Sequence, residues 1–213
     1  MSIGRPVASV QPWPVVALPP DTVVLDLTRG PVPPPRWYLG RYDEDRPSQY
    51  PGPHFDGRTV HLGLDLGAPA GTSVHAFAPG RVWRTGWNRG PGDYGPTVVV
   101  EHRVDPAWWP EGMVTDARLW ALYGHLAAAS LAASPVGREV EAGDVLGWLG
   151  EPRENGGWPP HVHLQLCTTA PPAADLSGVV RPEDRPVARV AYPDPSWLLP
   201  EPFRVALRRP SRA

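Results

Sequence analysis

Residues 161–166 read His161-Val162-His163-Leu164-Gln165-Leu166, and polar and apolar side chains alternate throughout this run. A period of two is typical of a β-strand with one face in a core. His161 and His163 therefore share the polar face. Two imidazoles at this spacing project side by side, with roughly 6–7 Å between their Cα atoms. The spacing suits a metal ligand next to a second histidine that faces the same metal, although a plain polar strand face fits the run equally well.

Other runs on either side of this one also indicate strands, because they are β-branched or alternate in the same way. They are residues 59–66, 73–76, 80–83, 97–102, 119–125 and 145–149. Glycines supply turns between them. Only residues 126–133, rich in alanine and leucine, favour a helix, and Pro106–Arg118 interrupts the pattern as an insertion loop. Short strands with almost no helix predict an antiparallel all-β body.

Proline marks the borders of this body, since it clusters at both ends of the chain and cannot donate a hydrogen bond to a strand ladder. We therefore expect a compact body over residues 59–168, an N-terminal arm over residues 1–58 and a C-terminal arm over residues 169–213. Aromatic residues such as Trp13 and Trp37 predict that the N-terminal arm packs on the body.

The composition excludes several kinds of protein. The 213 residues include 31 prolines and 22 glycines, which indicates turns and loops more than helical bundles. All 20 basic residues are arginine, so mechanisms that need a lysine are excluded, among them Schiff-base chemistry and lipoyl or biotinyl carriers. A single cysteine, Cys167, excludes an internal disulfide and a cysteine-rich metal site. A net charge of -2 offers no basic field for nucleic acid.

A second motif, His61-Leu62-Gly63-Leu64-Asp65, places its His and Asp on one face of a strand. A fully extended strand would separate them by about 13 Å, at roughly 3.3 Å per residue. One metal ion could not take both unless the chain bends, and Gly63 permits such a bend. Taken alone, the motif fits a surface strand with an unrelated His and Asp better than a metal site.

A third motif is Leu122-Tyr123-Gly124-His125-Leu126, a strand that ends in a histidine. His-x-Gly-x-Asp, then Tyr-Gly-His-Leu, then His-x-His in this order resembles the lysostaphin-type zinc endopeptidases, which cleave peptidoglycan cross-bridges and stem peptides. Residues 67–72, 80–82 and 140–147 also match that family in type and order. The resemblance covers residues 59–168.

The resemblance implies an antiparallel barrel-sandwich hybrid with a zinc cleft. It implies that His61, Asp65 and His163 bind Zn²⁺ and that His125 and His161 are the catalytic pair. Three ligands of mixed nitrogen and oxygen type leave a coordination position open, as a catalytic zinc requires. The implied activity is hydrolysis of peptide bonds, with a peptide of peptidoglycan as the substrate.

Two alternatives compete with this interpretation. A non-catalytic relative would use the same cleft to bind a peptide or a protein, but such relatives usually lose one of the five residues that this chain keeps. A histidine phosphocarrier would also use two facing histidines, but it has no need of Asp65.

Two features leave the substrate and the location open. The loop before His161 reads Asn155-Gly156-Gly157-Trp158-Pro159-Pro160, where relatives often carry small hydroxyl residues, so a bulky Trp158 stands at the expected rim of the cleft. Residues 1–20 lack the unbroken apolar run of a secretory signal, and no stretch is long enough to span a membrane. We expect a cytoplasmic protein if Met1 is the natural start, whereas the resemblance suggests the cell envelope.

Overall fold

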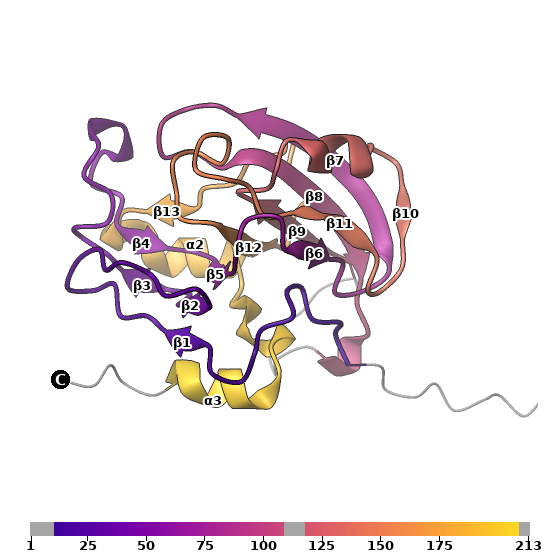
Figure 1. Cartoon of the computed structure of the whole chain (residues 1–213), viewed down its shortest axis with the longest axis horizontal. Helices are drawn as coiled ribbons and strands as arrows, with labels where there is room; N and C mark the ends of the chain where they lie inside the picture. Colours follow the sequence, from indigo (N-terminus) through magenta and orange to yellow (C-terminus); the bar gives the residue numbers. More distant parts are fainter. Residues whose placement is uncertain (1–10, 109–117, 209–213) are drawn as a thin grey trace, which may run out of the picture.

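The computed structural model describes residues 11–108 and 118–208. Its main element is an eight-stranded sheet in the order β1-β2-β5-β12-β9-β8-β7-β10 (Figure 1). The strands are β1 (Val23–Val24), β2 (Tyr38–Gly40), β5 (Leu64–Gly67), β7 (Gly80–Asn88), β8 (Gly95–Arg103), β9 (Arg118–Gly124), β10 (Glu139–Val140) and β12 (His161–Cys167). Neighbours pair antiparallel, except that β1 and β2 pair parallel.

Two smaller sheets accompany the large one. One pairs β6 (Ser73–His75) with β11 (Val145–Trp148), and the other has the order β13 (Val179–Val180), β4 (Val60–His61), β3 (Glu44–Asp45). The helices in the described ranges are short: α1 (Ala129–Ala133), α2 (Arg185–Ala191), α3 (Glu201–Arg208), and the 3₁₀ turns η1 (Pro53–Phe55), η2 (Pro106–Trp108), η3 (Pro182–Asp184) and η4 (Pro195–Leu198). The predicted all-β fold is confirmed.

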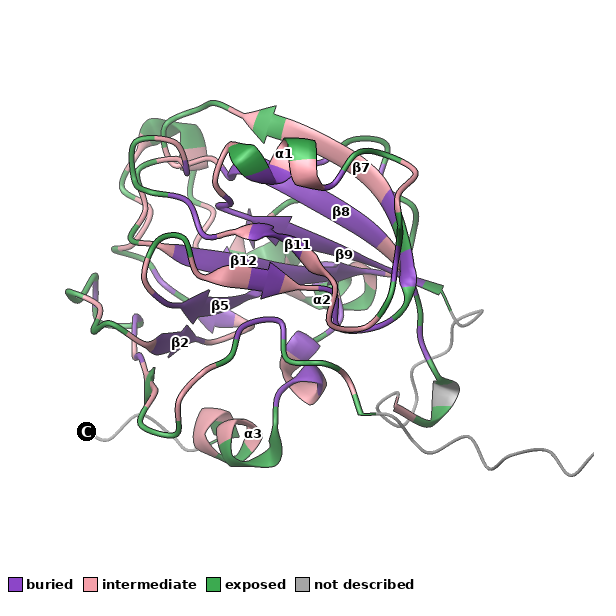
Figure 2. Cartoon of the chain, turned by 45° about the vertical axis from the view of Figure 1, so that its right-hand side comes forward, coloured by how far each residue is buried: buried purple, intermediate pink, exposed green. Residues whose placement is uncertain are grey.

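The hydrophobic core lies against one face of the large sheet, as the period-two pattern requires. Val162 and Leu164 of β12 are fully buried there and pack with Val98 and Val100 of β8. Figure 2 shows this burial as a continuous zone through β5, β12, β9 and β8. Burying each such side chain stabilises the fold by about 1.5–3 kcal/mol. The same alternation turns the polar residues of β12 to the opposite face.

The run at residues 59–66 is not one strand, which corrects the sequence-based expectation. It divides at Gly63 into β4 and β5, which belong to different sheets. A Cβ on Gly63 would lie 2.5 Å from Cε1 of His163, so the close approach of β12 requires glycine here. The bend that joint use of His61 and Asp65 needs is therefore present.

The helix predicted at residues 126–133 begins later, at Ala129, because Leu126 forms a β-bridge with Leu149. The expectation of only one helix was wrong, since α2 and α3 lie in the C-terminal segment. Both are short, with seven and eight residues. No helix in residues 11–108 or 118–208 is long and apolar enough to cross a membrane. Of the expected insertion loop, residues 109–117 lie outside the described ranges.

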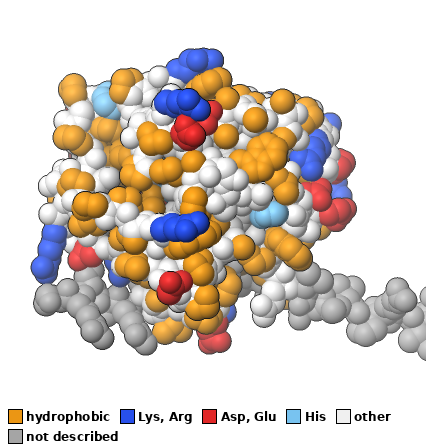
Figure 3. All heavy atoms as spheres, in the orientation of Figure 1, with side chains coloured by type: hydrophobic (Ala, Val, Ile, Leu, Met, Phe, Trp, Pro, Cys, Tyr) orange, Lys and Arg blue, Asp and Glu red, His pale blue; other side chains and the backbone are white. Residues whose placement is uncertain are grey.

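Both terminal segments contact the body. In the N-terminal segment, β2 pairs with β5 and Tyr38 is buried, whereas Trp13 is half-exposed. In the C-terminal segment, β13 pairs with β4 of the body. Arg185 of α2 also donates two hydrogen bonds to the carboxylate of Asp43 in the N-terminal segment, at 2.7 and 2.9 Å. Figure 3 shows arginine and acidic side chains interspersed on the face of the molecule it presents. We keep the division of the chain at residues 59 and 168 as a proposal.

Because His102 is buried, we expect the protein to lose stability in acid. Its Nδ1–H donates to the carbonyl of Ala78 at 2.8 Å, and its Nε2 lies 2.8 Å from the hydroxyl of Tyr123. Burial lowers the pKa of His102 to about 4. The unfolded chain takes up this proton near pH 6.5 and the folded chain only near pH 4. The free energy of unfolding therefore decreases, and the protein becomes less stable, as pH falls through this window. The loss is on the order of 2–3 kcal/mol between pH 7 and pH 4.5.

Urea unfolding at these two pH values, with a chelator present, measures this effect. The variant His102→Gln keeps a polar group in the core and should lose correspondingly less stability than wild type between the two pH values. Equal losses in the two proteins would contradict the assignment to His102.

Candidate metal centre

Strand β12 brings together the side chains that the three sequence motifs supply. It lies between β5 and β9, and His163 is in register with Asp65 on one side and with Gly124 on the other. His61 comes from β4, just before the bend at Gly63. His125 follows Gly124 at the end of β9 and has a φ of 62°, a left-handed conformation that is uncommon outside glycine. All five predicted site residues are buried and line one cleft.

His61, Asp65 and His163 lie close enough to hold one metal ion. One ligand atom from each of the three lies within 4.8 Å of the others. Oδ1 of Asp65 is 3.1 Å from Nε2 of His61 and 3.4 Å from Nδ1 of His163. The two ring nitrogens are 3.0 Å apart.

The protons of these two histidines point away from the cluster. Nδ1–H of His61 donates to the carbonyl of Arg41 at 2.9 Å. Nε2–H of His163 donates to Oε1 of Gln165 at 3.0 Å, while the amide nitrogen of Gln165 donates to Ser177. Carbonyl oxygens only accept hydrogen bonds, so the other nitrogen of each neutral ring carries a lone pair. Such outer partners fix the ring orientation of metal-binding histidines.

The cluster is therefore made of acceptors without a proton between them. Burial, followed by the nearby guanidinium of Arg46, lowers the pKa of His61 to about 4, so its ring is neutral near pH 7. Although burial alone would raise it, His61 and Arg46 hold the pKa of Asp65 well below its usual range. Two lone pairs and a carboxylate at these distances repel one another unless a cation lies among them. The donor set of two imidazoles and one carboxylate fits zinc.

His125 and His161 lie next to this cluster. Their ring centroids are 4.4 Å apart, and Nε2 of His161 is 3.6 Å from Oδ1 of Asp65. Nδ1–H of His161 donates to the carbonyl of Pro159 and Nδ1–H of His125 to that of Asn155, at 2.7 and 2.8 Å. Burial lowers the pKa of both, so each neutral ring offers a lone pair at Nε2. The arrangement provides two bases at one edge of the cluster of His61, Asp65 and His163.

The cleft over these residues has a volume of about 730 Å³, within the range of ligand-binding clefts. Its walls come from the N-terminal segment, from residues 90–94, from the loop at Trp158 and from residues 167–179. Tyr50 and Trp158 meet edge to face across it, with ring centroids 6.0 Å apart. The expectation that Trp158 stands at the cleft is confirmed.

Three residues of the site were not predicted from the sequence. Arg46 forms an ion pair with Asp65, at 2.8 Å between Nη1 and Oδ2. Tyr94 has its ring centroid 5.2 Å from that of His163 and donates from its hydroxyl to Gln165 at 3.2 Å. Gln165 follows His161 and His163 in the same alternation, but no role was predicted for it. Arg46 and Tyr94 stand in stretches without a periodic pattern, so only the fold brings them to the site.

The close approach at Gly63 gives a testable prediction. In Gly63→Ala the new Cβ would lie 2.6 Å from Nε2 of His163, so the ring must leave its partner Gln165. Loss of such a partner typically costs 10–100-fold in metal affinity, and we expect a loss of about this size for zinc. Competition with a chromophoric chelator measures it.

Gly71→Ala is the matched control for this change. Gly71 has a φ of +80°, so alanine strains the backbone there, but no atom lies within 4 Å of the new Cβ. This variant should lose stability and keep its zinc affinity. Wild-type zinc affinity in Gly63→Ala would contradict the proposed contact.

Curated relatives match a part of this chain. The DD-carboxypeptidase/endopeptidase Mpg of Neisseria meningitidis serogroup B is 31% identical over 118 residues, which is 55% of this chain and 22% of the relative. The protein of the same name from Neisseria gonorrhoeae matches to the same extent. The chain thus spans about a fifth of the length of these relatives.

Solved structures are similar over a comparable part. The catalytic domain of lysostaphin from Staphylococcus simulans shares 22% identity, with a TM-score of 0.40, over 62% of this chain and 80% of that one. A zinc-containing peptidase from Vibrio cholerae shares 21% identity, with a TM-score of 0.36, over 51% of this chain and 27% of that one.

The model of one protein family covers the body of the chain. Residues 59–174 match Peptidase family M23, and this range holds all five residues of the candidate metal centre. It begins at the strand of His61 and continues past β12. Since the match extends over more than half of the 213 residues, the chain belongs to peptidase family M23.

Proposed function

We propose that this protein is a zinc-dependent peptidase that hydrolyses peptide bonds in the cross-bridges or stem peptides of peptidoglycan. The observation that carries the proposal is the cluster of His61, Asp65 and His163, in which every ligand atom is an acceptor and every ring proton is bound elsewhere. Membership of the M23 family supports the peptidase activity.

His61, Asp65 and His163 would hold the metal through Nε2, Oδ1 and Nδ1, respectively. Zinc bound in this way supplies a Lewis acid that activates water near neutral pH and polarises the substrate carbonyl. The carbonyl of Arg41 and the buried side chain of Gln165 keep both rings turned toward the site. Burial of all three ligands limits competition from solvent.

His125 and His161 would carry the proton transfers. A lone pair at Nε2 lets one ring take a proton from the attacking water, and the resulting N–H can then be delivered to the leaving amine. The second ring, whose Nε2 also carries a lone pair, can accept a hydrogen bond from the same water and so orient it for attack. Their backbone partners at Pro159 and Asn155 hold both rings in the orientation that this requires.

The cleft suits a peptide substrate. It has aromatic side chains such as Tyr38, Tyr50 and Trp158 beside polar groups, and its volume accommodates a few residues of an extended chain. The matched relatives are described as a DD-carboxypeptidase/endopeptidase, which supports a peptide of peptidoglycan as the substrate. Such a substrate would place the activity in the cell envelope.

Digestion of purified peptidoglycan by the zinc-loaded protein tests this function. We expect new amino and carboxyl termini in the peptide part, identified by mass spectrometry, with glycan strands intact. Binding of peptidoglycan without any cleavage would favour the alternative, a binding module that uses the same cleft.

A further inference from the structure

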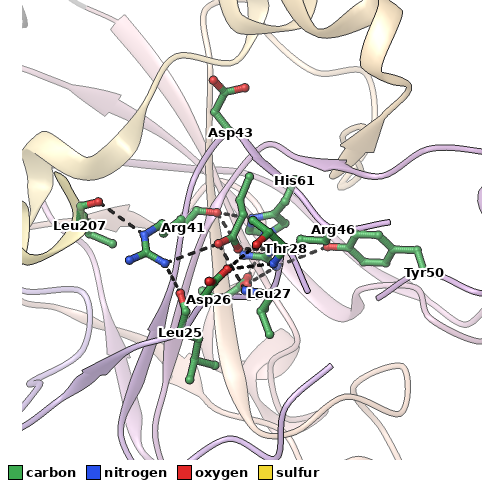
Figure 4. A network of polar contacts seen from close by, with 12 residues as sticks. Leu25, Asp26, Leu27, Thr28, Arg41, Asp43, Arg46, Tyr50, His61 and Leu207 are labelled. Carbon is green, nitrogen blue, oxygen red and sulfur yellow. Dashed lines mark hydrogen bonds and ion pairs between the residues drawn. The ribbon is translucent and has the colours of Figure 1, made fainter. Parts of the chain in front are cut away.

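We propose that Arg46, itself held by Glu44, positions the metal ligand Asp65. The proposal rests on the proposed metal site and adds to it a guanidinium–carboxylate pair from the N-terminal segment, outside the residues that match the M23 family. Figure 4 shows Arg46 reaching in beside His61, with Tyr50 on its other side.

In this contact the two carboxylate oxygens of Asp65 have different partners. Nη1 of Arg46 donates to Oδ2 at 2.8 Å, while Oδ1 faces the lone pairs of His61 and His163. A charge-assisted hydrogen bond of this length is strong and directional. Arg46 therefore leaves Oδ1 alone free for the metal and fixes the rotation of the carboxylate.

Arg46 cannot easily turn away from this position. It is 2% exposed, its Nε donates to Glu44 at 2.8 Å, and its Nη2 donates to the carbonyl of Arg41 at 3.1 Å. Arg41 is also the residue whose carbonyl accepts from His61. The same short stretch of chain thus orients two of the three ligands.

Strand β2 leaves room for the ion pair of Arg46 and Asp65. Gly40 of β2 is in register with Asp65, and a Cβ there would lie 2.5 Å from Oδ2 of Asp65 and 2.9 Å from Nη2 of Arg46. Any side chain at this position would press on the contact, so Gly40 keeps the space that the ion pair occupies.

Glu44 explains how the positively charged Arg46 can lie beside a metal site. A lone guanidinium at this distance would repel a divalent ion. Glu44 is also buried, with Oε2 on Arg46 and Oε1 accepting from the backbone N–H of Leu27 at 3.4 Å. The pair of Arg46 and Glu44 adds no net charge, so its effect on the metal is orientation.

The double variant Glu44→Gln/Arg46→Met tests this role, because it removes one charge of each sign and leaves the net charge of the site unchanged. Two measurements are made: the zinc Kd by chelator competition, and the visible spectrum of the protein loaded with Co²⁺. We expect the zinc Kd to rise by about 10–100-fold. We also expect weaker visible absorption of Co²⁺, because the released Oδ2 becomes available as an additional ligand.

Asp43→Asn/Arg185→Met is the control, since Arg185 and Asp43 form another hydrogen-bonded arginine–carboxylate pair, more exposed, between the N-terminal segment and α2. It should keep the wild-type zinc Kd and Co²⁺ spectrum. If the test variant does not fold, Arg46→Lys replaces it, because a single ammonium keeps the charge but not the fixed fork of donors. The same two changes are then expected, in smaller degree.

The outcomes separate this inference from the proposed function. A folded test variant with wild-type zinc Kd and an unchanged Co²⁺ spectrum would overturn the role of Arg46 while leaving the metal site intact. A wild-type protein that binds no zinc would overturn the proposed function and, with it, the role inferred for Arg46.

Discussion

The variant Asp65→Ala is expected to lose its zinc. Asp65 supplies the one negative charge among the three ligand side chains and lies within 3.4 Å of the two other ligand atoms. Without it, two neutral imidazoles remain, and the buried pair of Arg46 and Glu44 adds no net negative charge to replace the carboxylate. The loss of affinity should exceed the roughly 10–100-fold that removal of an outer partner costs. Elemental analysis after dialysis against buffer with a weak chelator measures it, and His61→Ala and His163→Ala should behave alike.

Asp175→Ala is the control for this experiment. Asp175 lines the same cleft but is not part of the ligand cluster, so its replacement should leave the zinc content at about one ion per chain. Full zinc content in Asp65→Ala would show that the ion binds elsewhere. The fold should survive all of these changes, because the hydrophobic core lies on the opposite face of β12.

Replacement of His125 or His161, the proposed catalytic pair, should separate metal binding from hydrolysis. We expect His161→Ala and His125→Asn to keep their zinc and to lose activity by about 10²–10⁴-fold, the usual contribution of general acid–base groups. Asparagine is chosen at position 125 because it tolerates the left-handed backbone found there. Zinc content and the rate of peptide release from peptidoglycan are measured on the same preparations.

His54→Ala provides the comparison for these two variants. His54 lines the cleft without joining the histidine cluster, so we expect activity near that of wild type. Undiminished hydrolysis in His161→Ala or His125→Asn would refute the assigned proton transfers. Loss of zinc in either would instead make that histidine a ligand.

The three motifs taken together, through the family that they resemble, predicted the residues that the fold brings together, whereas no single motif was sufficient. Strict alternation placed His161 and His163 on one face of a strand, and the distance along an extended chain required a bend at Gly63. Both features depend on neighbours within a few residues, where the period of a strand and the freedom of glycine apply directly.

The sequence did not predict the surroundings of these residues. Arg46 reaches Asp65 across 19 positions of the chain, and Tyr94 reaches Gln165 across 71. No local pattern encodes such contacts, because they follow from which strands become neighbours. The helix α2 was missed for a related reason. Its exposed Val187 and Val190 do not mark a buried face, and its buried Ala188 packs against Val60 and Leu62, which are far away in the sequence.

The location of the metal tests the account most directly. Crystals of the zinc-loaded protein, measured on both sides of the zinc absorption edge, give an anomalous difference map that identifies the ion and its position. We predict one strong peak per chain among Nε2 of His61, Oδ1 of Asp65 and Nδ1 of His163. A zinc peak at other residues, or none at this cluster in zinc-loaded crystals, would contradict the account.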